Sequence, residues 1–365
     1  MDERNLWLWL AEALHYNPKQ IEAVCKVFPS PKDVYDLSLS ELRTFTALTK
    51  AEQEALADKD LSYLEEKKNA WQAQRVWFLT PADEEYPSAL RELPERPAVL
   101  FGYGTLPDFS AFSLTLAITG TRSCTRYGER ITPLLTRELA EAGVLLVSGL
   151  SEGVETLAAR EAERVGGTVL AVAAGGIDQI YPKCNRSLFE SISKKGAVVS
   201  EFPPGTPPLR HLLPYRNRLL SGLSDAVLVV EAGNRSGTRI TTDYALSQGR
   251  DVLAVPGNID SAKSIGTNRM IQEGALPVLS AADIFTQYSS RFQGRTIKAP
   301  EEATAPELSG AAKLVYDQLD RDEAVTLDGL AEKTGLPMSV LTLVLTQLEL
   351  AGHIQRLAGN RFVLK

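Results

Sequence analysis

The sequence contains few of the residues that hold metal ions or form disulfides. Among 365 residues there are 3 cysteines and 3 histidines. The cysteines are far apart, and no Cys-x-x-Cys pair or zinc-like Cys/His spacing occurs. We therefore expect reduced thiols, no metal site and no cofactor. The residues concerned are Cys25, Cys124, Cys184, His15, His211 and His353.

Long apolar segments are also missing. No run approaches the roughly 20 apolar residues that a membrane-spanning helix needs. The chain starts Met-Asp-Glu-Arg, and its first apolar stretch is only Leu6–Leu10. A secretory signal has a basic start and a longer apolar core. These absences predict a cytoplasmic protein that does not bind membranes.

Positive charge is scarce overall but not everywhere. The formal net charge of −7 argues against a protein that coats DNA by bulk charge. Any nucleic-acid site must then be a local basic patch. The stretch from Phe202 to Ser224 contains no acidic residue and carries Arg210, Arg216 and Arg218. It predicts a basic arm, although an ordinary surface loop could have the same composition.

The standard motifs of nucleotide-processing enzymes are absent as well. There is no G-x-G-x-x-G after a strand, no phosphate-binding G-x-x-x-x-G-K-[ST] and no G-x-S-x-G elbow. Three acidic residues near predicted strand ends, Glu152, Glu155 and Glu231, lie in different loops and suggest no Mg²⁺ cluster. We predict a protein that holds phosphates without attacking them, and therefore not an enzyme.

The spacing of apolar residues changes along the chain and predicts several domains. Residues 1–70 predict a module of short helices, because apolar residues recur at helical spacing. Residues 71–112 predict a connecting segment with one strand at Val76–Leu79. A linker at 288–309 precedes a winged helix at 310–365, whose hairpin turns at Gly359-Asn360.

The central part, residues 113–287, alternates short apolar runs with helical patterns. This alternation predicts an α/β domain with a Rossmann-like, mostly parallel sheet and helices on both faces. The first helix has Ile131, Leu135 and Leu139 on one face, with Pro133 expected in its first turn. The predicted strands are Leu114–Thr119, Val144–Ser148, Val169–Ala173, Ala197–Ser200, Ala226–Val230, Val252–Val255 and Pro277–Leu279.

Glycine-rich loops follow the first, second, third and fifth of these runs. In an open parallel sheet such loops share the carboxyl edge, where ligands bind. Glycine lets the backbone approach an anion, a helix N-terminus adds N–H donors, and arginine grips phosphate with two hydrogen bonds. Each loop could also serve only to connect strand to helix. The candidate phosphate contacts are Gly120, Arg122, Gly149, Gly153, Gly176, Lys183, Asn185, Arg210, Arg216, Asn217, Arg218, Arg235, Ser236 and Gly237.

Eight short motifs between about residues 113 and 285 resemble, in order, those of the bacterial DNA-processing protein A (DprA/Smf) family. They include Gly120-Thr-Arg122, Val147-Ser-Gly-Leu150, Ser200-Glu-Phe-Pro-Pro-Gly, Arg216-Asn-Arg218, Arg235-Ser-Gly237 and Val255-Pro-Gly257. Outside this range the resemblance is one of architecture, with a sterile-alpha-motif-like module before the sheet domain and a winged helix after it.

The resemblance implies a protein that binds single-stranded DNA, forms a homodimer through its Rossmann-like domain and loads RecA recombinase during natural transformation. It also implies phosphate contacts at Arg122, Lys183, Arg210, Arg216, Arg218, Ser236 and Gly237. The dimer contact is implied near Thr267–Glu273, at Met270 and Ile271. These two residues could instead cap the sheet.

Two stretches depart from the family pattern. Gly153-Val-Glu155 replaces the usual Gly-Ile-Asp, and Ala159 stands where a histidine is usual. In the N-terminal module, His15–Gln20 replaces a Gly-Ile-Gly hairpin suited to DNA backbone contact. These departures leave the role of Glu155 open and argue against a DNA grip of that kind by the module.

Two other functions remain as alternatives. A Rossmann-fold nucleotide phosphoribohydrolase would share the strand-end loops but needs a Pro-Gly-Gly-x-Gly-Thr type loop, whereas this chain has Val255-Pro-Gly-Asn. A winged-helix DNA-binding regulator would need base-reading side chains on its recognition helix. That helix, expected at about Ser339–Ala351, has no Arg or Lys and carries Glu349, so we expect the module to dock against protein.

Overall fold

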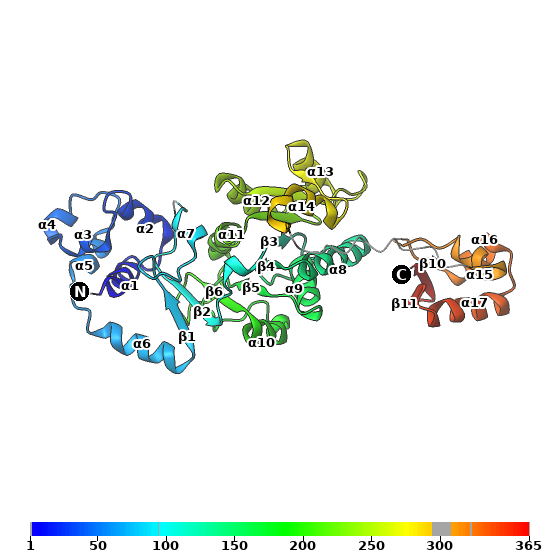
Figure 1. Ribbon diagram of the computed structural model, residues 1–365, viewed down its shortest axis with the longest axis horizontal. Coiled ribbons are helices and arrows are strands. Elements are labelled where there is room, and N and C mark those ends of the chain that lie inside the picture. Colours follow the sequence, from blue (N-terminus) through cyan, green and yellow to red (C-terminus); the bar gives the residue numbers. More distant parts are fainter. Residues whose placement is uncertain (1, 94, 294–307, 322, 365) are drawn as a thin grey trace. The chain divides into compact units, whose positions relative to one another are not determined.

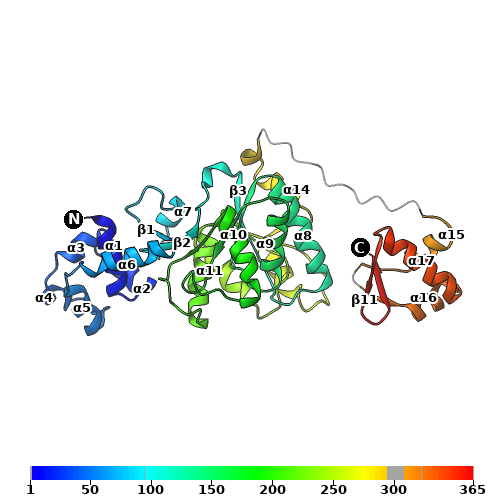
Figure 2. The same cartoon turned by 90° about the horizontal axis from the view of Figure 1, so that it is seen from below.

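The computed structural model describes residues 2–93, 95–293, 308–321 and 323–364 (Figures 1 and 2). Residue contacts divide the chain into two compact units: the N-terminal helices with most of the sheet domain, and the C-terminal module together with residues 125–130. None of the helices in the described part of the chain combines the length and apolarity that a bilayer-spanning segment requires.

Six short helices begin the chain. They are α1 (Glu3–Ala13), α2 (Pro18–Cys25), α3 (Pro31–Tyr35), α4 (Leu39–Leu42), α5 (Lys50–Ala57) and α6 (Tyr63–Ala73). Ser30, Ser38 and Thr49 form capping boxes at three of their N-termini. The module shares one apolar core with the neighbouring strands, since Trp9 and Leu10 belong to the same buried cluster as Phe101. Helix α6 runs through the domain boundary predicted at residue 70.

The turn between α1 and α2 keeps an unusual backbone without glycine. His15 and Tyr16 both have positive φ, at 52° and 53°, a region that costs a side-chain-bearing residue energy. Tyr16 is held there by packing against Phe101 and by its hydroxyl, which donates to Glu12 over 2.7 Å. The missing glycines therefore do not prevent a tight left-handed turn at this place.

The sheet has nine strands in the order β1-β2-β6-β5-β4-β3-β7-β8-β9. They are β1 (Val76–Leu79), β2 (Leu100–Gly104), β3 (Leu114–Thr119), β4 (Val144–Ser148), β5 (Val169–Val172), β6 (Ala197–Ser200), β7 (Ala226–Val229), β8 (Asp251–Ala254) and β9 (Leu276–Pro277). From β6 to β9 all neighbours are parallel, whereas β1 and β2 pair antiparallel at one end. The mostly parallel sheet is confirmed, and the segment expected only to connect domains supplies two of its strands.

Most predicted strand bounds hold because buried parallel strands are continuous aliphatic runs, while β8 and β9 each begin one residue earlier than predicted. β3, β4 and β6 begin and end where predicted, and β5 and β7 are one residue shorter. The prediction for the first helix was wrong in one respect. α8 (Arg126–Glu141) begins earlier than expected, so Pro133 lies inside the helix and not in its first turn. Its missing N–H removes a hydrogen bond from that interior turn.

The helices cover both faces of the sheet. α8, α9 (Val154–Arg164) and α10 (Arg186–Lys195) accompany the strands from β3 to β6. α11 (Leu213–Gly222), α12 (Thr238–Ser247), α13 (Ile265–Gln272) and α14 (Ala281–Gln287) belong to the return path and lie on the other side of the strands in Figure 1. Strand addition thus reverses between β3 and β7. In doubly wound sheets a ligand crevice opens at such a reversal.

The C-terminal module is a small unit with its own core. It contains α15 (Gly310–Tyr316), β10 (Val325–Thr326), α16 (Leu327–Thr334), α17 (Met338–Leu350), β11 (Ile354–Leu357) and β12 (Arg361–Leu364). The predicted winged helix is confirmed, with the hairpin turn at Gly359 and Asn360, both of positive φ. Helix α17 buries Leu341 and Leu345 but leaves Leu343 60% and Leu350 84% exposed.

Candidate nucleic-acid interface

A pocket opens at the strand reversal between β3 and β7. Its cavity measures about 390 Å³ and lies among the loop after β3, the start of α9, helix α11 and the N-terminus of α12. Hydroxyl groups dominate its wall, with Thr119, Thr121, Ser151, Ser236, Thr238 and Thr241. The predicted residues Gly120, Arg122, Arg216, Asn217, Ser236 and Gly237 all line it. The tertiary structure therefore brings parts of three predicted segments into one cavity.

The glycines after β3 and β4 are needed for contact between the loops themselves. A side chain at Gly120 would lie 2.8 Å from the Glu231 carbonyl oxygen, and one at Gly153 would lie 2.3 Å from that of Thr121. The Thr121 N–H donates to Glu231 over 2.7 Å, and the Val154 N–H donates to Thr121 over 3.2 Å. These two glycines let the strand-end loops interlock.

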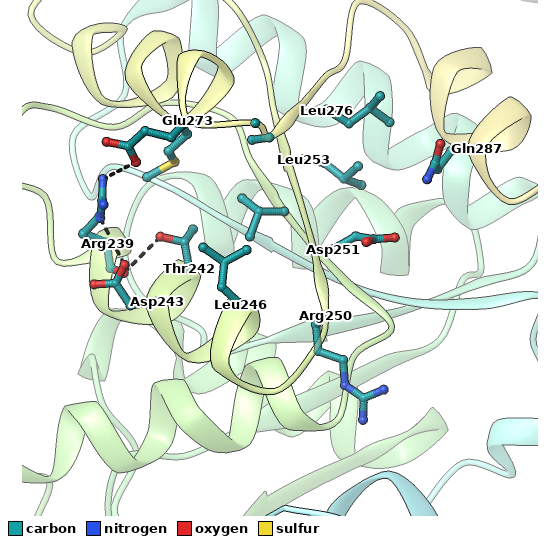
Figure 3. A pocket seen from close by; sticks show the side chains of 14 residues that line it. Arg239, Thr242, Asp243, Leu246, Arg250, Asp251, Leu253, Glu273, Leu276 and Gln287 are labelled. Atoms are coloured by element: carbon teal, nitrogen blue, oxygen red, sulfur yellow. Dashed lines mark hydrogen bonds and ion pairs between the residues drawn. The ribbon is translucent and has the colours of Figure 1, made fainter.

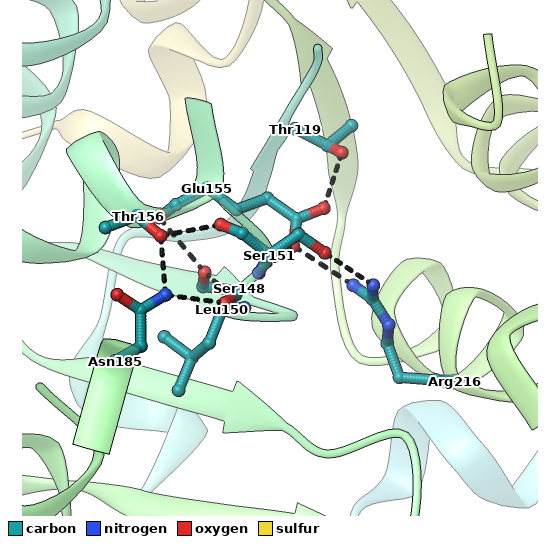
Figure 4. A network of polar contacts seen from close by, with 8 residues as sticks. All are labelled: Thr119, Ser148, Leu150, Ser151, Glu155, Thr156, Asn185 and Arg216. Carbon is teal, nitrogen blue, oxygen red and sulfur yellow. Dashed lines mark hydrogen bonds and ion pairs between the residues drawn. The ribbon is translucent and has the colours of Figure 1, made fainter. Parts of the chain in front are cut away.

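Glu155 lines the pocket. Its carboxylate lies at the centre of a network of polar contacts (Figure 4). Its carboxylate accepts hydrogen bonds from the Thr119 hydroxyl at 2.8 Å, the Ser151 N–H at 2.9 Å and the Arg216 guanidinium at 3.1 Å. Burial by itself raises the pKa of Glu155, but Arg216 and the hydrogen bonds outweigh it and hold the pKa below its ordinary value. Glu155 is thus an ionised, fully engaged carboxylate.

Arg216 is buried by the same network. It is 5% exposed, and its second terminal nitrogen donates to the Ser151 hydroxyl over 2.9 Å. Gly149 is required here, because a Cβ at that position would lie 1.4 Å from an Arg216 nitrogen. Arg216 therefore reaches the pocket as half of a neutral ion pair. The expectation that it offers phosphate an unpaired charge needs correction.

Arg218 lies deeper and faces the core. It is 2% exposed and forms an ion pair with Glu201, itself 5% exposed. Burial raises the pKa of Glu201 above its ordinary value, against the lowering effect of Arg218. The phosphate contact expected at Arg218 therefore stays a prediction that this burial does not favour.

Asn185 also has an internal task. It is 2% exposed, and its side-chain N–H group donates to the Leu150 carbonyl at 2.9 Å and to the Thr156 hydroxyl at 2.7 Å (Figure 4). It thereby fixes Leu150, which has a positive φ of 55°. The side-chain N–H group of Asn185, which was expected to contact phosphate, instead holds the loop after β4 in this structure.

The remaining predicted cations are exposed. They come from the loops after β3, β5 and β7 and from the segment between β6 and α11, and in the part of the chain that the structure describes none of them forms an ion pair: Arg122, Lys183, Arg210 and Arg235. Of these, Arg122 lines the pocket itself. Gly176 packs between Asp178 and Pro203 and takes no part in the pocket lining.

The N-terminus of α12 lines the pocket with Ser236, Gly237 and Thr238. It begins after Gly237, which has no side-chain cap and faces open space. Ser236 turns the backbone there, since its hydroxyl accepts from the Thr238 N–H over 3.2 Å. The N–H groups of Thr238, Arg239 and Ile240 thus have partners within this turn, and what the helix end offers an anion is the positive end of its dipole beside an open glycine.

Sequence reasoning missed Lys263. This residue follows β8, whose carboxyl end lies at the same sheet edge as the glycine loops. Its ammonium group donates to the Thr121 hydroxyl over 3.1 Å and to the Ser123 hydroxyl over 2.8 Å. Applying the strand-end rule to the run Val252–Val255 would have found it, because Lys263 is the first lysine or arginine after that run.

The predicted dimer residues lie on α13 at the other end of the return path. Met270 is 6% exposed and belongs to the core cluster that includes Val252 and Ala254, while Ile271 is half-buried. Met270 is therefore a core residue, contrary to its expected role as a surface contact. The described residues form no group of three or more His, Cys, Asp or Glu side chains placed to hold a metal ion.

Comparison with known proteins agrees with this architecture. The family model described as "DNA recombination-mediator protein A" matches residues 77–289, and the model described as "DprA winged helix domain" matches residues 299–360. Protein Smf of Escherichia coli is 37% identical over 295 residues, which cover 80% of this chain and 78% of that protein. DNA processing protein DprA of Bacillus subtilis is 36% identical over 222 residues, covering 61% and 74%.

Two solved structures extend the comparison. DNA processing protein A from Streptococcus pneumoniae has a TM-score of 0.67 at 32% identity, covering 78% of this chain and 97% of that one. A structure that gives insights into the single-stranded DNA binding mode of DNA processing protein A from Helicobacter pylori has a TM-score of 0.53 at 27% identity, covering 59% and 96%. The two family models together span the sheet domain and the winged helix, and this chain is therefore a member of the DNA-processing protein A (DprA/Smf) family.

Proposed function

We propose that this protein binds single-stranded DNA along the carboxyl edge of its sheet. The observation that carries the proposal is the pocket between β3 and β7, where Arg122, a row of hydroxyls and the N-terminus of α12 meet. Each of these groups suits a backbone phosphate. The similarity to the Helicobacter pylori protein, whose structure concerns single-stranded DNA, supports the same ligand.

Single strands suit this edge better than duplex. The exposed cations sit on separate loops and can follow a flexible backbone. Tyr181 is 53% exposed and lies two residues from Lys183, so its ring can stack on an unpaired base. With about four cationic contacts, log affinity should fall against log salt with a slope near −3, at about −0.7 for each neutralised phosphate.

One fluorescence-anisotropy titration tests the proposal. It compares a labelled single strand, the same sequence as duplex, and a mononucleotide competitor, each at several salt concentrations. We expect the single strand to bind most tightly, with the negative salt slope. Equal affinity for duplex, or displacement by the mononucleotide at equal concentration, would contradict the proposal.

The same binding would serve a role as recombination mediator, in which the protein protects single strands and loads RecA. Support comes from the family, whose model is named for recombination mediation. The test measures assembly of RecA on a single strand already covered by single-strand-binding protein, with and without this protein. We expect faster assembly in its presence, and an unchanged rate would remove the RecA role.

We also propose a homodimer through the edge formed by α12, β8 and α13. A hollow of about 320 Å³ lies there, with Leu246 63% exposed at its rim (Figure 3). Arg239 forms ion pairs with Asp243 and Glu273 beside it, so the patch carries charges of both signs. An exposed leucine among charges of both signs suits an isologous contact between two copies, in which unlike charges can face each other.

Because Met270 is buried, the dimer is better tested at Leu246. Leu246→Arg places a charge in the proposed contact without entering the core, and light scattering should report a folded monomer. Val27→Arg, at an exposed position after α2, is the matched control and should leave the dimer intact. A dimer that survives Leu246→Arg lies elsewhere.

Hydrolysis is not part of the proposal. Glu155 is the carboxylate that lines the pocket, and its two oxygens are engaged by Thr119, Ser151 and Arg216. A carboxylate whose pKa is held below its ordinary value by a paired arginine is a weak general base near neutral pH. Labelled DNA and nucleoside monophosphates incubated with Mg²⁺ or Mn²⁺ should stay intact. Cleavage that disappears in Glu155→Gln would establish an active site.

A further inference from the structure

Lys263 is held at the phosphate-facing loop by contacts that its sequence position does not reveal. Its ammonium nitrogen donates to two hydroxyls, those of Thr121 and Ser123, at 3.1 and 2.8 Å. These two residues flank Arg122, the pocket's exposed cation. Lys263 and Arg122 therefore reach the same four-residue turn from two different loops.

The backbone of Lys263 is fixed as firmly as its side chain. Its carbonyl accepts from the Ala232 N–H over 2.7 Å, and the Ala232 carbonyl accepts from the Gly266 N–H over 2.8 Å. Ala232 follows Glu231, whose carbonyl in turn accepts from the Thr121 N–H over 2.7 Å. A chain of backbone hydrogen bonds thus joins the loops after β3, β7 and β8 and sets where the lysine emerges.

The charge on Lys263 is not neutralised by these partners. Hydroxyl oxygens are neutral acceptors, and no ion pair to Lys263 occurs among the residues that the structure describes. An ammonium group has three donors, of which two point at the hydroxyls. Lys263 is half-buried. Its position leaves a positive charge at the sheet edge with a donor to spare.

We infer that Lys263 is a further phosphate-binding residue, which grips the DNA backbone beside Arg122 and extends the site from the pocket toward the loop after β8. The inference rests on the proposed binding of single-stranded DNA. It places a second cation at the turn Gly120–Ser123. In this inference the hydroxyls of Thr121 and Ser123 hold the ammonium group of Lys263 in position. The buried pair Arg216–Glu155 is neutral as a whole. The positive charge that a phosphate can meet at this place is therefore supplied by Arg122 and Lys263.

The test compares Lys263→Met with Lys263→Arg in the full-length protein, using anisotropy with a labelled single strand. Loss of one contact removes about 0.7 from the salt slope and lowers affinity about eightfold at 50 mM salt. Lys263→Met should show both effects, whereas Lys263→Arg keeps the charge and should keep the slope. Lys195→Met removes an exposed lysine at the C-terminal end of α10 and should change neither.

The outcomes separate this inference from the proposed function. Wild-type protein that fails to bind single strands overturns both. Wild-type binding with an unchanged slope in Lys263→Met overturns the inference alone, even if affinity drops, because a purely structural cross-link would weaken binding without altering the slope. A reduced slope shared by Lys263→Met and Lys195→Met would mark a general charge effect and also overturn it.

Discussion

Two groups of cationic side chains in the sheet domain look alike in sequence and differ in the structure. Arg216 and Arg218, on α11, are buried and paired with Glu155 and Glu201. Arg122, Lys183 and Arg235, on the strand-end loops, are exposed. The first group stabilises the fold around the site. Only the second group offers charge that an incoming phosphate can neutralise.

The two buried pairs also differ from each other. Both oxygens of Glu155 accept hydrogen bonds, and the pKa of Glu155 is lowered. In the pair of Arg218, one oxygen of Glu201 finds no hydrogen-bond partner among the described residues, and the pKa of Glu201 is raised. A buried ion pair is favourable only when its remaining polar atoms are satisfied. Among the described residues the pair at the pocket leaves one buried atom without a hydrogen-bond partner, Nε of Arg216, whereas the core pair leaves three: Nε and Nη1 of Arg218 and one oxygen of Glu201.

The largest expected effect is on stability and concerns Arg218. Arg218→Met leaves Glu201 buried without its partner and should lower the free energy of unfolding by about 3–5 kcal/mol. Arg122→Met, at an exposed position, should change it by less than about 0.5 kcal/mol. Urea denaturation of both variants measures the difference. Equal losses would abolish the distinction between the two groups.

The next effect is on binding and concerns the exposed group. Arg122→Glu combined with Lys183→Glu removes two phosphate contacts, which should weaken single-strand binding by at least roughly 60-fold at 50 mM salt. Lys194→Glu with Lys195→Glu makes the same charge change at the C-terminal end of α10. Anisotropy should show a much smaller loss for this control. Undiminished binding by the first variant would remove the strand-end loops from the site.

A third effect separates the two buried pairs by their pH dependence. Because the pKa of Glu155 is lowered by folding, its contribution is present above the ordinary value of 4.5 and is lost as pH falls through the folded pKa. The pKa of Glu201 is raised, so its contribution falls as pH rises from 4.5 through the folded pKa.

Glutamine variants measure these opposite signs. The stability of wild type relative to Glu155→Gln should increase as pH rises through the acid range, and relative to Glu201→Gln it should decrease. Chemical denaturation at a series of pH values provides the curves. Slopes of the same sign would mean that the two pairs are electrostatically equivalent.

The smallest expected effect concerns the winged helix, whose helix α17 has no arginine or lysine. Deleting residues 310–365 should change single-strand affinity by less than about tenfold, or 1.4 kcal/mol. The oligomeric state must be checked in parallel, since a lost dimer would weaken binding indirectly. If the affinity falls by more than this while the dimer stays intact, the winged helix itself contacts DNA. The strand-end loops would then contribute less of the binding free energy than proposed.

Periodicity and turn chemistry in the sequence were sufficient to predict the strands from β3 to β8, the winged helix and the edge of the sheet that carries the site. Buried parallel strands are aliphatic runs, and glycine clusters follow them where loops must meet, so both signals are local. The antiparallel strand β2 was missed because its pairing with β6 joins residues far apart in the chain.

Only the tertiary structure decided which of the cationic side chains are buried in ion pairs and which remain exposed. From the sequence, Arg216, Arg218 and Arg122 are equally good candidates for phosphate contacts. In the structure Arg216 and Arg218 are buried and each forms an ion pair with a glutamate, so these two residues stabilise the domain. Lys263 gains its place beside Arg122 through hydrogen bonds between loops more than 100 positions apart in sequence. Residue type fixes what a side chain can bind, while the fold decides whether that capacity faces a partner in the chain or remains for a ligand.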